Sequence, residues 1–208
     1  FVPRAGMVGT SMTLDGVELL GRRTGLVAYL ERGSTYGIPL LAPWANRLRE
    51  HEQSIDGVTW SVRPGDPGVH ADENGLAIHG LLAGFDGFEV EEIAVDGDRA
   101  VLRARLEFGP RLDRFAAFPF PHDLVVEAEV WGTTLTIRTS LTATGTTPVP
   151  VAFGWHPYVA FPDTPRAEWT LDAPFTRSAV LSDLFVPTGE VVDVPAASGA
   201  LGTTAYDD

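Results

Sequence analysis

Two of the five histidines in this sequence stand in contexts that suit acid–base chemistry. His156 follows an apolar run and precedes Pro157, which restricts the backbone of His156 to extended geometry and so aims its ring. His79 precedes Gly80, and a glycine lets a backbone or a ligand approach closely. Imidazoles exchange protons near neutral pH, which makes both residues candidate proton donors or acceptors. The alternative is a structural histidine at the end of a strand in each case.

A second cluster places three recognition groups side by side. Trp44, Asn46 and Arg47 follow Pro43 within a few residues. An amide and a guanidinium can hold neighbouring hydroxyls through paired hydrogen bonds, and an indole can stack on a sugar ring. The alternative is a turn in which Asn46 bonds to the backbone and Arg47 faces solvent.

Missing residue types exclude several chemistries. The chain has no cysteine, and all fifteen of its basic residues are arginine. Thiolate metal sites, Cys–His catalysis, Schiff bases and phosphate-binding P-loop lysines are therefore excluded. The other histidines, His51, His70 and His122, have no metal-ligand spacing, and no serine lies in a G-x-S-x-G elbow. We expect neither a metal nor an organic cofactor.

Charge and hydropathy limit the partners. The formal charge of −13 over 208 residues disfavours nucleic acid and anionic membranes, which attract basic surfaces. No apolar run reaches the roughly 18 residues needed to span a bilayer, and no signal-peptide pattern is evident. These features predict a cytoplasmic protein. The hydrophobic content of 44% is that of a folded domain.

The elements that must position these residues are predicted to be strands. An Asp-Gly pair at 56–57 indicates one hairpin, and residues 88–95 and 100–108 around Asp96-Gly97-Asp98 indicate a second. Alternation of apolar and polar residues continues over 124–130 and 135–141. Residues 149–153 and 168–172 are further strand candidates, and no helix longer than two turns is evident. Successive strands without intervening helices predict an all-β protein, a sandwich or a barrel.

Taken together, the segments resemble the aldose 1-epimerase (galactose mutarotase) family over essentially the whole chain. The matching segments, in order, are the first hairpin at 6–20, residues 38–47 with the motif Pro43-Trp44-Ala45-Asn46-Arg47, Ile78-His79-Gly80, Phe118-Pro119-Phe120, Gly154-Trp155-His156-Pro157-Tyr158 and Tyr206-Asp207-Asp208. The resemblance implies a large antiparallel β-sandwich in a single domain, residues 1–208. The motif that ends in His156-Pro157-Tyr158 is the most specific of these.

The resemblance also implies roles for individual residues. His156 would protonate the ring oxygen of an aldose as general acid, and His79, the second candidate catalytic residue, would hold the ring or its hydroxyls. Asn46, Arg47 and Asp207 would bind hydroxyls, with Trp44 and Tyr158 as aromatic contacts. The partner would be a small-molecule aldose, with no cofactor, and the oligomeric state is left open. The sequence departs from the family in one respect, because the family's catalytic glutamate lies downstream of the late aspartate motif. We therefore assign no base, read Glu190 as a loop residue, and expect the C-terminal strands of the sandwich to be missing.

Three functions stay open at this point. The first is an aldose 1-epimerase acting on free hexoses. The second is a carbohydrate-binding β-sandwich without catalysis, which the missing base favours. The third is a hexose-6-phosphate 1-epimerase, for which Arg22, Arg23 and Arg47 could form a phosphate site.

Overall fold

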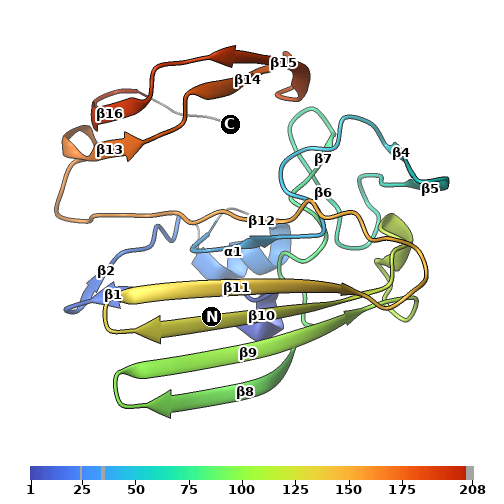
Figure 1. The fold of residues 1–208 in the computed structure, drawn as a ribbon, viewed down its shortest axis with the longest axis horizontal. Helices are drawn as coiled ribbons and strands as arrows, with labels where there is room; N and C mark the ends of the chain where they lie inside the picture. The colour runs from blue at the N-terminus through green and yellow to red at the C-terminus, as the bar shows by residue number, and fades with distance from the viewer. Residues whose placement is uncertain (24, 34–35, 205–208) are drawn as a thin grey trace.

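A computed structural model describes residues 1–23, 25–33 and 36–204, and its largest element is a four-stranded antiparallel sheet (Figure 1). Its strands are β8 (Glu89–Asp96), β9 (Arg99–Phe108), β10 (His122–Trp131) and β11 (Thr134–Ala143), in the order β11-β10-β9-β8. Neighbours in sequence are neighbours in the sheet, joined by short turns at 97–98 and 132–133. The hairpin predicted around Asp96-Gly97-Asp98 and the strands predicted from the period-two pattern are confirmed.

The two faces of this sheet differ in chemistry. On one face of β10, Leu124, Val126 and Ala128 are buried, and Leu106 pairs opposite Leu124 from β9. The opposite face carries ion pairs between strands, among them Arg99 to Glu129 at 3.0 Å, Arg105 to Asp123 at 2.6 Å and Arg138 to Glu127 at 2.8 Å. One face therefore belongs to the core and the other meets solvent, as alternation requires.

Loops and very short strands cover the core face. Met7, Leu40, Leu81 and Phe120 pack there with no exposed surface, in one cluster with the sheet residues. The covering pairs are β3 (Leu40–Leu41) with β12 (Gly154–Trp155), and β6 (His70–Ala71) with β7 (Ala77–Ile78). Two further hairpins lie at the periphery, β1 (Thr13–Leu14) with β2 (Val17–Glu18) and β4 (Glu52–Ile55) with β5 (Val58–Ser61). The last confirms the hairpin predicted at Asp56-Gly57.

One helix, α1 (Gly25–Arg32), was not predicted from the sequence. The helix is eight residues long, which is too short to show a sustained helical period. Tyr29 packs with Val8 and Tyr36 in a second small cluster, against which Leu26 also packs. Single 3₁₀ turns occur at Pro3–Ala5, Phe115–Ala117 and Arg166–Glu168. None of the helices in the described ranges is long and apolar enough to cross a bilayer.

The C-terminal strands form a separate layer, drawn in orange and red in Figure 1, on the far side of β12 from the sheet. Here β13 (Thr170–Ala173) pairs with β16 (Ala197–Ala200), and β14 (Arg177–Leu181) with β15 (Pro187–Asp193). Glu190 lies on β15, so its reading as a loop residue was wrong, although it is exposed.

Two predicted strand positions also need correction. Residues 149–153 form no strand beyond a single bridge from Ala152 to Trp44, and the strand begins at Gly154. Pro148 and Pro150 lack the N–H groups that a ladder needs, which explains the late start. Near 168–172 the strand begins at Thr170, because Arg166–Glu168 first form a 3₁₀ turn.

Candidate functional site

A cleft of about 320 Å³ brings together the two sequence motifs that carry polar recognition groups and the two candidate histidines. Its lining comes from three chain segments: Leu41, Ala45, Asn46 and Arg47; Ile78 and His79; Gly154, Trp155 and His156. The antiparallel pairing of β12 with β3 fixes the first segment against the third. A bridge between Arg47 and Ile78 fixes the first against the second. Residues more than a hundred positions apart in sequence therefore share one small site.

The backbone around His79 is unusually constrained. His79 has a φ of +65° and donates its backbone N–H to the carbonyl of Asn46 at 3.0 Å, while Asn46 itself has a φ of +58°. Gly80 follows with a φ of +76°, and any Cβ there would collide with the Ala42 carbonyl. The group that approaches Gly80 closely, as the sequence predicted, is therefore the backbone of Ala42. This packing places His79 at the cleft.

Both the backbone and the ring of His156 contact neighbouring residues. Its backbone N–H donates to the carbonyl of Pro39 at 3.1 Å, and its ring stacks on that of Tyr158 with centroids 4.5 Å apart. The rings of His156 and His79 lie 6.3 Å apart, nearly edge to face at 68°. His156 is exposed and His79 is half-buried, so two imidazoles face one opening from different walls. That arrangement allows two proton-exchanging groups to reach one small ligand.

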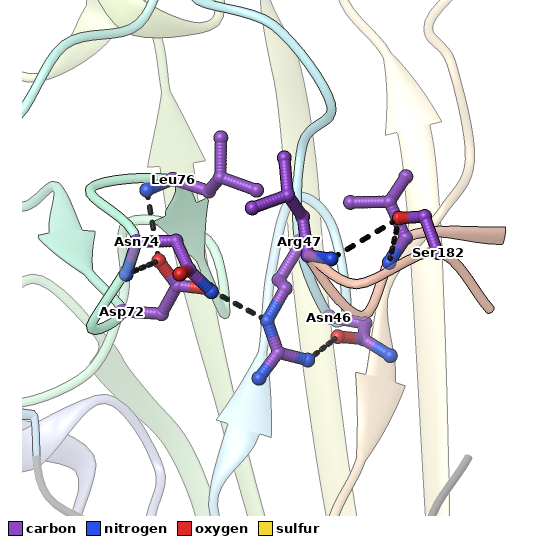
Figure 2. Close-up of polar contacts among 8 residues, drawn as sticks. Asn46, Arg47, Asp72, Asn74, Leu76 and Ser182 are labelled. Carbon is purple, nitrogen blue, oxygen red and sulfur yellow. Dashed lines mark hydrogen bonds and ion pairs between the residues drawn. The ribbon is translucent and has the colours of Figure 1, made fainter.

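Asn46 and Arg47 are part of a polar network rather than a solvated turn (Figure 2). Arg47 Nη1 donates to Asn46 Oδ1 at 3.1 Å, and Arg47 Nε donates to Asp72 Oδ2 at 2.8 Å. The side chain of Arg47 is only 16% exposed and that of Asp72 only 2%. Sequence reasoning missed Asp72, although the Asp-Glu-Asn-Gly stretch at 72–75 is a turn signal.

The tip of the β14–β15 hairpin borders this network. The guanidinium carbon of Arg47 lies 5.2 Å from the ring centroid of Phe185, within the range of a cation–π contact. Ser182 Oγ accepts the backbone N–H groups of Leu184 and Val186, which shapes the tip beside Asn46 and Arg47 (Figure 2). Phe185 was not predicted as a site residue.

Two predicted contact residues, Trp44 and Tyr158, are placed differently from the four that line the cleft. Trp44 is 5% exposed and belongs to the hydrophobic core, so its ring packs inside instead of lining the cleft. Tyr158 lies against His156 on one side and Arg23 on the other, with the Arg23 guanidinium 5.5 Å from its ring. It supports a cleft residue and is not itself among the lining residues. Asp207 falls outside the described residues.

Two of the arginines considered for a phosphate site, Arg22 and Arg47, each form an ion pair with a carboxylate. Arg22 pairs with Glu18. Burial raises the pKa of Glu18, but hydrogen bonds from Ser11, Met12 and Leu20 together with the Arg22 charge lower it by more, to about 2. Arg47 pairs with Asp72. The three remaining histidines lie outside the cleft: His122 is buried in the core, His70 lies on β6, and His51 Nδ1 bonds to the Val62 carbonyl at 3.1 Å.

Comparison with known proteins decides the family. The family model for aldose 1-epimerase matches residues 10–203. This chain belongs to the aldose 1-epimerase family. A search of curated protein sequences gave no match. The predicted family resemblance is therefore confirmed by a match that covers most of the chain.

Solved structures agree on the fold. A galactose mutarotase-like protein from Clostridium acetobutylicum superposes with a TM-score of 0.79 at 18% identity, covering 92% of this chain and 57% of its own. A protein from Synechocystis sp. PCC 6803 gives a TM-score of 0.68 at 22% identity, covering 94% and 59%. The galactose mutarotase-like β-sandwich predicted for this chain is thus confirmed. This member of the aldose 1-epimerase family spans less than three fifths of the length of these two structures.

Proposed function

We propose that the cleft binds a free aldose and that this chain supplies the general acid of a mutarotase reaction. The observation that supports this most is the convergence of His79, His156, Asn46 and Arg47 on one opening of about 320 Å³. That volume lies at the small end of ligand pockets, which suits a monosaccharide. The family match supports an isomerase acting on sugars.

The reaction requires a proton at one oxygen and the loss of a proton at another. In this proposal His156 donates a proton to the ring oxygen while a base removes the proton of the anomeric hydroxyl. The bond between the ring oxygen and the anomeric carbon then breaks, and an open-chain aldehyde forms. Rotation of the carbonyl and reclosure, with both proton transfers reversed, give the other anomer. His79, Asn46 and Arg47 hold the sugar hydroxyls in this scheme.

A second candidate is sugar binding without catalysis. One observation favours it: none of the residues that line the cleft, within the described part of the chain, is a carboxylate. Among the described lining residues, no glutamate is therefore in place to act as the base. Binding alone needs only the hydrogen-bonding groups and no base.

Polarimetry of freshly dissolved α-D-glucose and α-D-galactose tests the proposal. The protein should accelerate mutarotation above the buffer rate, and His156→Ala should lower that acceleration by about a hundredfold or more, the usual contribution of a general acid. His51→Ala is the matched control, because His51 lies outside the cleft, and it should leave the rate unchanged.

The other outcomes separate the alternatives. Saturable binding of either sugar without acceleration would favour the binding module. Neither binding nor acceleration in a folded sample would overturn both. Acceleration of mutarotation for α-D-glucose 6-phosphate but not for the free sugars would favour the hexose-6-phosphate epimerase. Equal acceleration for α-D-glucose 6-phosphate and free α-D-glucose would exclude that function.

A further inference from the structure

Among the described contacts, Asp72 forms its only ion pair with Arg47. Its side chain is 2% exposed and lies 25 positions from Arg47 in sequence. A carboxylate taken out of water is unfavourable unless it is paired and hydrogen-bonded. Asp72 meets that requirement beside the cleft, although it is not one of the lining residues.

The two carboxylate oxygens of Asp72 have separate partners. Oδ1 accepts the backbone N–H groups of Asn74 and Leu76, both at 2.9 Å, whereas Oδ2 accepts Arg47 Nε at 2.8 Å. The same loop is also closed by backbone bonds, from Asp72 N–H to the Leu76 carbonyl at 3.0 Å and from Gly75 N–H to the Asp72 carbonyl at 3.1 Å. Oδ1 thus stabilises the loop at 72–76, and Oδ2 is held by that loop in position to bind Arg47.

The bond from Asp72 helps to define the plane of the Arg47 guanidinium. A guanidinium is rigid and planar, so two hydrogen bonds at different nitrogens fix its orientation. Nε bonds to Asp72 and Nη1 bonds to Asn46 Oδ1 at 3.1 Å, as Figure 2 shows. Burial raises the pKa of the Asp72 carboxyl, but the bonds from Leu76, Arg47 and Asn74 lower it by more, which keeps the group ionised at neutral pH.

We propose that Asp72 is a positioning residue, which holds the Arg47 guanidinium in the orientation needed to bind an aldose in the cleft. The inference rests on the proposed function, because it assigns Arg47 to the sugar. It adds a residue outside the cleft on which sugar affinity depends. Asp72 acts through Arg47 and makes no contact with the ligand itself.

The variant Asp72→Asn tests the roles of the two carboxylate oxygens separately. The amide oxygen can still accept the Asn74 and Leu76 N–H groups, but the amide NH₂ then faces the N–H of Arg47 Nε, donor against donor. Loss of a charged hydrogen bond of this kind corresponds to a rise in Kd for D-galactose of about tenfold or more. Asp123→Asn is the matched control, because Asp123 pairs with Arg105 at 2.6 Å on the outer face of the sheet, away from the cleft. It should leave Kd unchanged.

A double-mutant cycle distinguishes positioning from a purely structural role. Lysine at position 47 keeps the charge but has no planar fork, so Asp72→Asn should raise Kd much less in Arg47→Lys than in the wild type. Asp72→Glu is a second variant that keeps the charge of the pair and moves the carboxylate by one methylene. It should also weaken binding if orientation matters, even if Asp72→Asn proves poorly folded.

The measurements are Kd for D-galactose and D-glucose by titration calorimetry, with far-UV circular dichroism to check folding. Equal weakening by Asp72→Asn in both backgrounds would overturn the proposal, as would wild-type affinity in folded Asp72→Asn or, where that variant is unfolded, in Asp72→Glu. Failure of the proposed function looks different, because the wild type itself would then bind neither sugar, and the inference about Asp72 would fall with it.

Discussion

The four-stranded sheet and the C-terminal hairpins are both made of antiparallel strands, yet they bury very different amounts of side chain. In the sheet, β10 places His122, Leu124, Val126 and Ala128 in the core. Among the described residues after Ala128, Val186 alone is a buried hydrophobic residue. Strand pairing alone therefore does not make a core. The packing of one face against another layer does.

The candidate site lies in the layer between these two regions. Its lining comes from segments packed on the sheet, and no described residue of the hairpins is among the lining residues. The tip of β14–β15 borders the site through Phe185, which contacts Arg47. Two contacts connect the tip to the site loop: the Arg47 guanidinium lies over the Phe185 ring, and Arg49 donates to the Pro187 carbonyl. Val186, next to Phe185, is buried. The comparison implies that the sheet region supplies the stability and that the hairpin tip borders the site without carrying the fold.

The largest effect should come from truncating a phenylalanine in the sheet region. Phe120 is fully buried, so Phe120→Ala should lower the free energy of unfolding by about 3–5 kcal/mol. Phe175→Ala is the matched control in the C-terminal region, where Phe175 is 74% exposed, and it should change stability by no more than about 0.5 kcal/mol. Urea unfolding measures both. Similar losses from the two variants would contradict the comparison.

An intermediate effect should follow from Val186→Ala. Removing two buried methyl-sized groups should weaken the docking of the hairpin by about 1.5 kcal/mol, and this should raise amide exchange in β14 and β15 by about tenfold. Exchange in β9 and β10 should stay as in the wild type, because those strands do not depend on the hairpin. Val191→Ala, at an exposed position of β15, provides the control. If exchange in the sheet rose equally, the two regions would be one cooperative unit.

The smallest effect should be a pH dependence of the sheet region. Burial lowers the pKa of His122 from its ordinary 6.5, against a smaller opposing effect of its bond to the Phe120 carbonyl. The unfolded chain therefore binds more protons than the folded one below pH 6.5, and the free energy of unfolding should decrease as pH falls from 7 to 5. One proton limits the slope to about 1.4 kcal/mol per pH unit.

His122→Gln should flatten that dependence. His70, whose pKa is also lowered by burial and by the nearby Arg114, contributes in the same direction, so some slope should remain. The check is urea unfolding of both proteins at several pH values. An unchanged slope in the variant would assign the pH dependence to other groups.

Local sequence patterns predicted the sheet because its strands carry their own signals. Leu102, Ala104, Leu106 and Phe108 alternate with charged residues, and an Asp-Gly pair supplies the turn. Helix α1 and the start of β12 were missed because eight residues and two residues are too short for a periodic pattern to decide the structure. Both depend on packing against segments far away in the sequence.

The site residues likewise fall into those that local motifs predicted and those that only long-range contacts place at the cleft. His79, His156, Asn46 and Arg47 were predicted from motifs, and the structure places them around one cleft, while their chemical roles stay predictions. Asp72 and Phe185 could not be found, because each owes its place to a contact with Arg47 across 25 or more residues. For Trp44 the motif gave the residue type but could not tell an indole in the core from one that faces a ligand.

Asn46 and His79 both adopt left-handed backbone conformations, which favour glycine and cost a non-glycine residue about 1 kcal/mol or more. Glycine at either position would relax the chain and remove a side chain from the cleft. Selection for a more stable variant would therefore favour losing these two groups, even though neither lies in the core. Recognition and backbone stability therefore oppose each other at His79 and Asn46, and a screen for thermal tolerance alone would not protect these two cleft side chains.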